Sequence, residues 1–219
     1  MDETNLQARP YLIGIAGTSC SGKTKLARHL SRLLSAVILP LDCYYFDLSH
    51  LPLDERAHCN FDIPEALDRE LLLAHVAGLS QGQEIPRPVY DFAVHARTSQ
   101  VEIVKPGRYV IVEGLFSLYW EEARKLFGTK VFVDLDDQKC LERRISRDVR
   151  ERGRTPESVL QQFNGTVRPM AEAYIRPTRG FADLTVRGDD PIDRSLARVM
   201  AHVNRNRRRF DATKSARPR

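Results

Sequence analysis

The stretch GIAGTSCSGKT, residues 14–24, constrains the fold of this chain more than any other feature. Its glycines Gly17 and Gly22, followed by Lys23 and Thr24, match the pattern G-x-x-x-x-G-K-[ST]. The apolar run YLIGIAG predicts a buried strand into this stretch, and KTKLARHLSRLLS has leucines at helical spacing after it. A glycine-rich surface loop would require neither flank. The order strand, loop, helix therefore predicts a phosphate-binding loop.

The chemistry of this loop follows from its backbone. Helix N-terminal N–H groups point at an anion, and glycines let the main chain wrap around it without Cβ clashes. In such loops the lysine reaches the β- and γ-phosphates, and the hydroxyl after it ligates Mg²⁺. The motif predicts a nucleoside triphosphate and Mg²⁺, but it does not identify the phosphate acceptor. The residues expected to contact phosphate are Gly17, Thr18, Ser19, Cys20, Ser21, Gly22, Lys23 and Thr24.

Composition narrows the class of protein. A chain of 219 residues with 42% hydrophobic and 29% charged residues is typical of a soluble globular protein with one core. No apolar run approaches the ~20 residues that span a bilayer, and the N-terminus lacks a signal-peptide pattern, so we expect a cytoplasmic protein without membrane association. The four cysteines form no C-x-x-C pair, which favours free thiols over zinc or disulfides.

The basic charge of the chain is concentrated at one end. Residues 205–219 contribute +6 to a total of +5, so residues 1–204 sum to −1. We therefore predict a basic, disordered tail over 205–219 and a nearly neutral body, which disfavours nucleic acid as the partner.

Apolar runs alternate with amphipathic stretches, which predicts an α/β fold with a mainly parallel five-stranded sheet flanked by helices. The expected strands are residues 11–16, 36–41, 108–114, 130–135 and 182–187. The expected helices are residues 23–35, 64–78, 120–127, 137–152, 156–174 and 192–204. Residues 85–105 interrupt this alternation and predict a β-hairpin insertion, and insertions of that length are usually functional. We expect a flexible N-terminus over 1–10 and a single domain over 11–204.

Acidic residues end three of the predicted strands, where ligands bind in open α/β sheets. Asp42 follows the second strand, Glu113 ends the third, and Asp134 and Asp136 follow the fourth. Helix caps or ordinary loop acids would explain each of them equally well. The pattern alone does not rank Glu113 against Asp134 as the acid beside Mg²⁺.

The segment ERRISRDVRERGR holds six arginines. Arg143, Arg147, Arg150 and Arg154 recur at spacings of 4, 3 and 4, which predicts a single helical face. A solvated helix with ion pairs is the alternative. Beside a phosphate-binding loop we favour a lid that closes over the triphosphate.

Seven segments in order resemble the uridine kinase (uridine/cytidine kinase) family of P-loop kinases. They are GIAGTSCSGKT, LDCYYFD, NFDIPEALD, PVYDFAVHAR, VEGLF, RRISRDVRERGR and VRPMAEAYIRPTRGFADLTVRG, and they span residues 11–188. The resemblance implies transfer of the γ-phosphate of ATP or GTP to the 5′-hydroxyl of uridine and cytidine, giving UMP and CMP in pyrimidine salvage. It implies a nucleoside-binding hairpin over 85–105, a lid over 142–180 and a homo-oligomer, a tetramer.

The resemblance also implies roles for individual residues. Asp42 would be the general base, with Lys23 and Arg147 completing the catalytic set, and Arg152 would bind phosphate. Thr24 and Glu113 would hold Mg²⁺, so the resemblance favours Glu113 over Asp134 as the acid beside the ion. Asp62 would hold the ribose with Arg144 and Gln162, and an aromatic–aromatic–histidine pocket would hold the base. The nucleoside-binding residues implied are Asp62, Tyr90, Phe92, His95, Arg144, Arg154 and Gln162.

Two departures and two alternatives remain. Cys20 stands where the family often has Gly, Ala or Ser, and Lys25 stands where a hydroxyl or small residue is common. A kinase resembling phosphoribulokinase or pantothenate kinase would share the phosphate-binding loop, although YDFAVH suits a planar base better than a sugar phosphate. A non-catalytic nucleotide- or RNA-binding protein could use the basic tail, although an intact Lys23, Asp42 and Glu113 argue against it.

Overall fold

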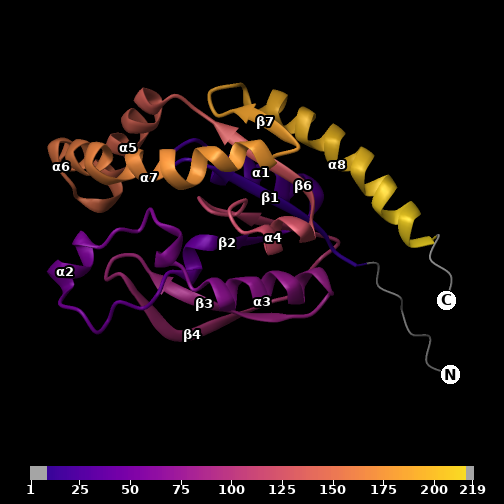
Figure 1. Cartoon of the computed structure of the whole chain (residues 1–219), viewed down its shortest axis with the longest axis horizontal. Helices are drawn as coiled ribbons and strands as arrows, with labels where there is room; N and C mark the ends of the chain where they lie inside the picture. Colours follow the sequence, from indigo (N-terminus) through magenta and orange to yellow (C-terminus); the bar gives the residue numbers. More distant parts are fainter. Residues whose placement is uncertain (1–8, 216–219) are drawn as a thin grey trace.

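The computed structural model describes residues 9–215, in which strands and helices alternate along most of the chain (Figure 1). Five strands form one sheet in the order β2-β5-β1-β6-β7, and every pairing in it is parallel. This confirms the predicted fold class. The prediction of flexibility over 1–10 falls outside the described residues except at Arg9 and Pro10. The strands are β1 (Tyr11–Gly17), β2 (Val37–Pro40), β5 (Tyr109–Glu113), β6 (Phe127–Asp134) and β7 (Leu184–Arg187).

Strand β1 shows how the core is divided between the two faces of the sheet. Tyr11, Ile13 and Ile15 pack with α1 and α8, whereas Leu12 and Ala16 pack with α3 and α4. Successive side chains of a strand point to opposite faces, so a strand covered on both sides reads as a continuous apolar run. The covering helices are α1 (Lys23–Leu34), α3 (Arg69–Ser80), α4 (Glu121–Leu126) and α8 (Ile192–Ser215).

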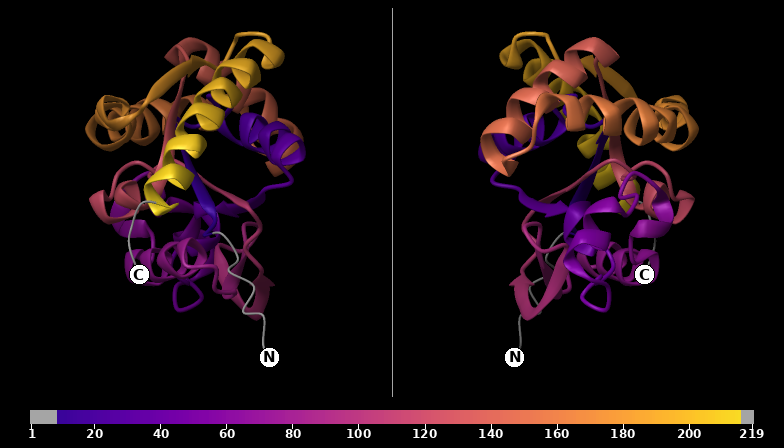
Figure 2. Two further views of the ribbon diagram at one scale, coloured as in Figure 1. Left: turned by 90° about the vertical axis from the view of Figure 1, so that its right-hand side faces the viewer. Right: turned by 90° about the vertical axis from the view of Figure 1, so that its left-hand side faces the viewer.

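Two insertions lie in the lower and upper halves of the molecule as drawn in Figure 1. The first is the antiparallel hairpin of β3 (Ile85–Asp91) and β4 (Ala96–Val104). The second is the helical region of α5 (Asp137–Arg152), α6 (Pro156–Gln162) and α7 (Arg168–Met170), which continues through π-helical turns to Ile175. Figures 1 and 2 show the hairpin at the bottom of the molecule and α5 and α6 in its upper half.

Two helices differ from the sequence prediction. Helix α3 begins at Arg69 rather than near Pro64, because the Asp68 side chain accepts the Leu71 N–H at 3.1 Å and caps the helix there. Residues 64–66 instead form a short 3₁₀ turn. The six-residue helix α2 (Leu53–His58) was not predicted, because so short a segment has little periodicity.

Helix α8 continues to Ser215, so the predicted disorder of the tail is wrong over Arg205–Ser215. Arg207 explains part of this, because it is buried with its guanidinium 5.8 Å from the Tyr11 ring centroid and 5.4 Å from that of Tyr109. It also donates to the Arg108 carbonyl at 3.3 Å. Residues 216–219 lie outside the described part of the chain. Neither α8 nor any other helix within 9–215 is long and apolar enough to cross a membrane.

Candidate active site

The phosphate-binding loop connects β1 to α1 at the carboxyl edge of the sheet. A Cβ on Gly17 would lie 2.5 Å from the Val133 carbonyl oxygen, so only glycine fits there. Gly22 caps α1 with φ of +107°, a left-handed conformation that favours glycine. Cys20 also has a positive φ, +62°, which costs a non-glycine residue about 1–2 kcal/mol and is typical of functional loops.

Lys23 and Thr24 begin helix α1 and point in two directions from it. The Lys23 ammonium is buried and donates to the Thr18 carbonyl at 3.4 Å, inside the loop. The Thr24 hydroxyl lies 3.3 and 3.2 Å from the two carboxylate oxygens of Glu113 at the end of β5. Burial raises the pKa of Glu113, and the nearby Lys23 ammonium partly opposes that rise.

Asp134 lies in a different environment. It contacts the guanidinium groups of Arg179 at 3.2 Å, Arg187 at 3.9 Å and Arg176 at 4.0 Å. The structure therefore brings Glu113, and not Asp134, next to Thr24, where strand-end position alone left the two equivalent.

The hydroxyl of Thr24 and the carboxylate of Glu113 fit a magnesium ion. Mg²⁺ prefers hard oxygen ligands and is usually held by one or two protein groups together with substrate phosphates and water. No group of three or more His, Cys, Asp or Glu side chains within residues 9–215 is arranged to hold a metal alone. The pair therefore suits an ion that arrives with a triphosphate.

Two more carboxylates, those of Asp42 and Asp62, lie close enough for their charges to interact. Asp42 lies in the 3₁₀ turn Leu41–Tyr44 immediately after β2, where it is exposed. Asp62 is buried, and burial raises its pKa while Arg144 and Lys23 lower it. The charge of Asp42 raises the pKa of both Asp62 and Glu113. Acidic side chains from three separate segments therefore lie near one another, and the charge of Lys23 acts on two of them, Asp62 and Glu113.

Only two members of the predicted helical stripe, Arg147 and Arg154, belong to the set of arginines that converge. Helix α5 ends at Arg152, and Gly153 turns the chain with φ of +62°, so Arg154 does not continue the helical face. Arg143 donates to the Gly188 carbonyl at 3.0 Å, and Arg150 pairs with Glu151 at the surface. The converging residues are Arg144, Arg147, Arg152 and Arg154, and all four contact Asp148.

Arg144 connects this arginine cluster to the phosphate-binding loop. It donates to the Ser19 hydroxyl at 2.8 Å and to the Gln162 side-chain oxygen at 3.0 Å. Arg154 donates to the same Gln162 oxygen. Arg144 of the predicted lid therefore contacts the loop, and Gln162 links Arg144 to Arg154.

Aromatic side chains form a second cluster beside the hairpin. His95 stacks on Phe61 with ring centroids 4.9 Å apart and planes inclined by 22°. Tyr45 contacts Phe61 at 5.3 Å and Tyr90 at 5.7 Å. The rings of Tyr90 and Phe92 contact each other edge to face, with centroids 5.1 Å apart, so no gap separates them. The two rings that are nearly parallel, those of Phe61 and His95, come from distant segments of the chain.

His95 lies in the turn between β3 and β4 rather than on a strand, with φ of +49°. Because of this turn, the His95 side chain does not follow the alternation of side chains along a strand, and its ring reaches that of Phe61. Burial lowers the pKa of His95, and the charges of Arg152 and Arg56 lower it further. The influence of Arg152 indicates that the arginine cluster and the aromatic cluster adjoin.

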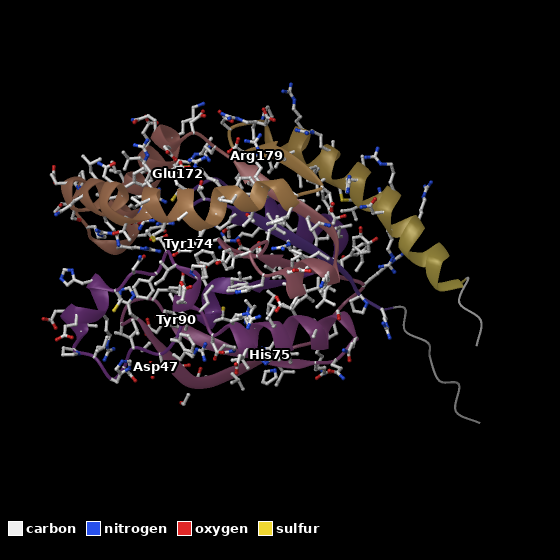
Figure 3. All side chains as sticks on the ribbon, in the orientation of Figure 1. Asp47, His75, Tyr90, Glu172, Tyr174 and Arg179 are labelled. Atoms are coloured by element: carbon white, nitrogen blue, oxygen red, sulfur yellow. The ribbon has the colours of Figure 1, made fainter. Side chains whose placement is uncertain are left out.

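Sequence reasoning missed Arg97, which joins the hairpin to the turn that carries Asp42. Its side chain donates to the carbonyls of Tyr45 and Tyr44, both at 2.8 Å, and to the Asp68 carboxylate at 3.0 Å. Its backbone N–H donates to Asp47 at 3.2 Å. Figure 3 shows Tyr90 and Asp47 in the hairpin half of the molecule, and Glu172 and Arg179 in the opposite half.

Phe61, Tyr45 and Asp148 were also missed. Each is adjacent to a predicted site residue or lies within a quoted motif, in NFD, LDCYY and RRISRD respectively. An aromatic beside a predicted ribose-binding acid was the available signal for Phe61. An acid among six arginines was the signal for Asp148.

Comparisons with known proteins agree with this geometry. Residues 12–190 match the model of the Phosphoribulokinase / Uridine kinase family. A uridine kinase of Chloroflexus aggregans is 41% identical over 203 residues, covering 90% of this chain and 97% of that protein. A uridine kinase of Deinococcus deserti is 44% identical over 181 residues, covering 81% and 87%. The phosphoribulokinase of Rhodobacter spheroides has a similar fold, with a TM-score of 0.60 at 17% identity over 84% of this chain and 74% of that one.

Proposed function

The chain belongs to the phosphoribulokinase and uridine kinase family, and from that premise we propose that it transfers the γ-phosphate of ATP to the 5′-hydroxyl of uridine and cytidine. The products would be UMP and CMP. One observation carries the choice of acceptor: an aromatic cluster with a stacked Phe61–His95 pair lies close enough to the arginine cluster for the charge of Arg152 to act on His95. A flat base fits aromatic walls, whereas a sugar phosphate has no group to stack.

Asp42 is the proposed general base. It lies exposed at the carboxyl end of β2, beside two other acids whose pKa values its charge raises. An acceptor hydroxyl placed between Asp42 and the loop would lose its proton to this carboxylate as phosphoryl transfer proceeds. The buried Asp62, with Arg144 and Gln162, would accept and donate hydrogen bonds to the ribose hydroxyls.

The triphosphate would lie on residues 17–24, with Lys23, Arg147 and Arg152 neutralising its charge. Thr24 and Glu113 would hold Mg²⁺ with the β- and γ-phosphates, and the ion would supply further charge neutralisation when bound. Phosphoryl transfer depends mainly on such neutralisation and on positioning. Arg144 contributes to both, because it bridges the loop and Gln162.

The base would lie against Tyr90, Phe92 and His95 of the hairpin, with Phe61 and Tyr45 as further walls. A lowered pKa keeps His95 neutral near pH 7. A neutral imidazole has one donor and one acceptor nitrogen, so it suits either uracil or cytosine. The Tyr90 hydroxyl supports the presence of a polar ligand edge, because it is buried and has no hydrogen-bond partner within the described residues.

The proposal further includes ATP as the donor, a cytoplasmic location, a nucleoside-binding hairpin over 85–105, a lid over 142–180 and a homo-oligomer. Residues 11–204 would form the catalytic domain. Light scattering of the purified protein tests the oligomer.

Phosphorylation of a nucleoside panel tests the function. We expect turnover of uridine and cytidine, and none of adenosine or thymidine, because a purine is too large and thymidine lacks the 2′-hydroxyl that Asp62 would bind. Lys23→Met serves as the inactive control. Faster turnover of ribulose 5-phosphate or pantothenate than of any nucleoside would overturn the proposal.

A further inference from the structure

Asp148 lies at the centre of the arginine cluster, and no solvent reaches its side chain. Its carboxylate oxygens are 2.8 Å from Arg147, 3.6 Å from Arg144 and 3.7 Å from both Arg152 and Arg154. These arginines come from α5 and from the segment beyond its end. One buried carboxylate therefore contacts four guanidinium groups that are not on one helical face.

This arrangement leaves the cluster strongly positive. Four cations around one anion give a net charge of about +3, and burying a carboxylate is tolerated only where it is paired in this way. Within the described residues, Asp148 Oδ2 and Arg144 Nε are buried without a hydrogen-bond partner, although they are 3.6 Å apart. Charge rather than saturated hydrogen bonding holds this part of the cluster, so guanidinium donors remain for an anion.

The cluster also points at the phosphate-binding loop. Arg144 donates to Ser19 of the loop at 2.8 Å. Arg147 lies near enough to Asp62 to lower the pKa of that acid, and Arg152 is near enough to His95 to lower the pKa of the imidazole. Different members of the cluster are therefore near different parts of the site: Arg144 contacts the loop, Arg147 lies near the proposed ribose acid, and Arg152 lies near the proposed base pocket.

We propose that Asp148 is a positioning residue for phosphoryl transfer: its carboxylate holds the four arginines as one unit and offsets part of their charge until the transition state. The idea rests on the proposed kinase function. Without the carboxylate, the guanidinium groups would bind the ground-state triphosphate more tightly but in less productive positions. Tighter ground-state binding raises no rate, because only interactions that strengthen in the transition state do so.

If Asp148 only stabilised the helix, its contribution would come from hydrogen bonds at the end of α5. The backbone carbonyl of Asp148, and not its side chain, accepts the N–H groups of Gly153 and of Arg154, the latter at 3.2 Å. Substituting the side chain therefore leaves the end of α5 intact. Glu151 provides a control, because it has the same charge on the same helix but is exposed, and its ion pair within residues 9–215 is with the exposed Arg150.

The experiment compares Asp148→Asn with Glu151→Gln. Calorimetry with inorganic tripolyphosphate, without any nucleoside, measures ground-state anion binding; uridine turnover measures kcat. We expect Asp148→Asn to bind tripolyphosphate about 3–10 times more tightly, as one fewer negative charge several ångströms away implies. We expect its kcat to fall about 10–100-fold, in the range of lost transition-state electrostatics. Glu151→Gln should change neither.

Unchanged or weaker tripolyphosphate binding by folded Asp148→Asn would overturn the proposal, and so would an unchanged kcat. If that variant does not fold, Asp148→Glu replaces it: the charge is kept but moved by one methylene, so we expect near wild-type tripolyphosphate affinity with a reduced kcat. A wild-type kcat in Asp148→Glu would overturn positioning. If no nucleoside is a substrate, the tripolyphosphate comparison still stands, so failure of the kinase function is distinguished from failure of this proposal.

Discussion

The two ends of the site are built in different ways. At the phosphate end, one loop over 17–24 and one region over 143–162 contribute nearly all the contacts, and charge dominates them. At the proposed nucleoside end, the aromatic residues come from the separate segments of Tyr45, Phe61 and His95, and Arg97 bonds to Tyr44 across 53 positions of the chain. There, stacked rings and hydrogen bonds to carbonyls dominate.

This difference predicts which substitutions impair each end of the site. A local, charged site loses function when a charge is removed, because its backbone is already set by the strand–loop–helix unit. A site assembled from distant segments depends equally on residues that never touch substrate, because they hold those segments together. The two ends should therefore respond separately: one in triphosphate handling, the other in nucleoside handling.

The largest effect should come from Asp42, which lies where the two ends meet. Asp42→Asn removes the proposed proton acceptor, and loss of a general base typically lowers the rate by ~10²–10⁴. We expect kcat to fall by this amount while the Kd of ATP stays unchanged, as measured by steady-state kinetics and calorimetry. Asp54→Asn on the exposed helix α2 is the control. A variant that keeps most of its kcat would show that Asp42 is structural.

Arg97 tests whether the nucleoside end depends on a residue outside the substrate contacts. Arg97→Lys cannot make all three side-chain hydrogen bonds of the guanidinium. With hydrogen bonds to charged groups worth about 1.5–3 kcal/mol, we expect kcat/KM for uridine to fall about 10–100-fold. Tripolyphosphate binding should not change.

Arg87→Lys is the matched control for Arg97, because Arg87 lies on the same hairpin and pairs with Glu102. Equal losses in the two variants would mean that the hairpin is generally destabilised and that Arg97 has no particular role in joining it to the turn of Asp42.

His95→Ala removes one member of the stacked pair. We expect KM for uridine and for cytidine to rise about 10-fold together, since the stack is worth about 0.5–1.5 kcal/mol and the lost hydrogen bond about as much again. The ATP parameters should stay constant. Intact turnover of both nucleosides would refute the pocket assignment without touching the kinase assignment.

The pH dependence of nucleoside binding sharpens the same assignment. The pKa of His95 is lowered below 6.5, so its neutral form persists through neutral pH and is lost only as the pH falls through that lowered value. We expect KM for uridine to be flat above pH 6.5 and to rise below it. Asp62 has a raised pKa and also titrates in acid, so His95→Gln, which cannot protonate, separates the two. A rise of equal size in His95→Gln would assign the effect elsewhere.

The smallest effect on catalysis should come from shortening α8, because its last turns contribute no residue to either end of the proposed site. We expect a chain ending at Asn204 to keep its kcat/KM for uridine but to unfold at a lower temperature, because it lacks the buried Arg207. Cation–π contacts of about 0.5–2 kcal/mol correspond to a loss of a few degrees in Tm, measurable by calorimetry. A chain ending at Arg208 keeps Arg207 and should match the full chain. A large loss of kcat/KM in the shorter chain would place α8 in the active assembly.

The sequence by itself determined the features that are local along the chain. The loop, its flanking strand and helix, the five apolar strands and the hairpin insertion are encoded by patterns within a dozen or so residues, and the structure has all of them. The sequence located the excess positive charge at residues 205–219, but it did not predict that helix α8 continues through them as far as Ser215. The buried Arg207 is stabilised by the rings of Tyr11 and Tyr109, which are 196 and 98 positions away in the chain, and no local pattern contains such contacts.

Only the tertiary structure decided the rest. Glu113 and Asp134 end equivalent strands, and what distinguishes them is that one faces Thr24 while three arginines surround the other. The helical stripe predicted only part of the arginine cluster: Gly153 ends α5 before Arg154, and the arginines that the family resemblance implied, Arg144, Arg147, Arg152 and Arg154, contact Asp148. The physical reason is common to both cases: a side chain's environment is set by the segments packed against it, and periodicity records only which side of its own element it is on.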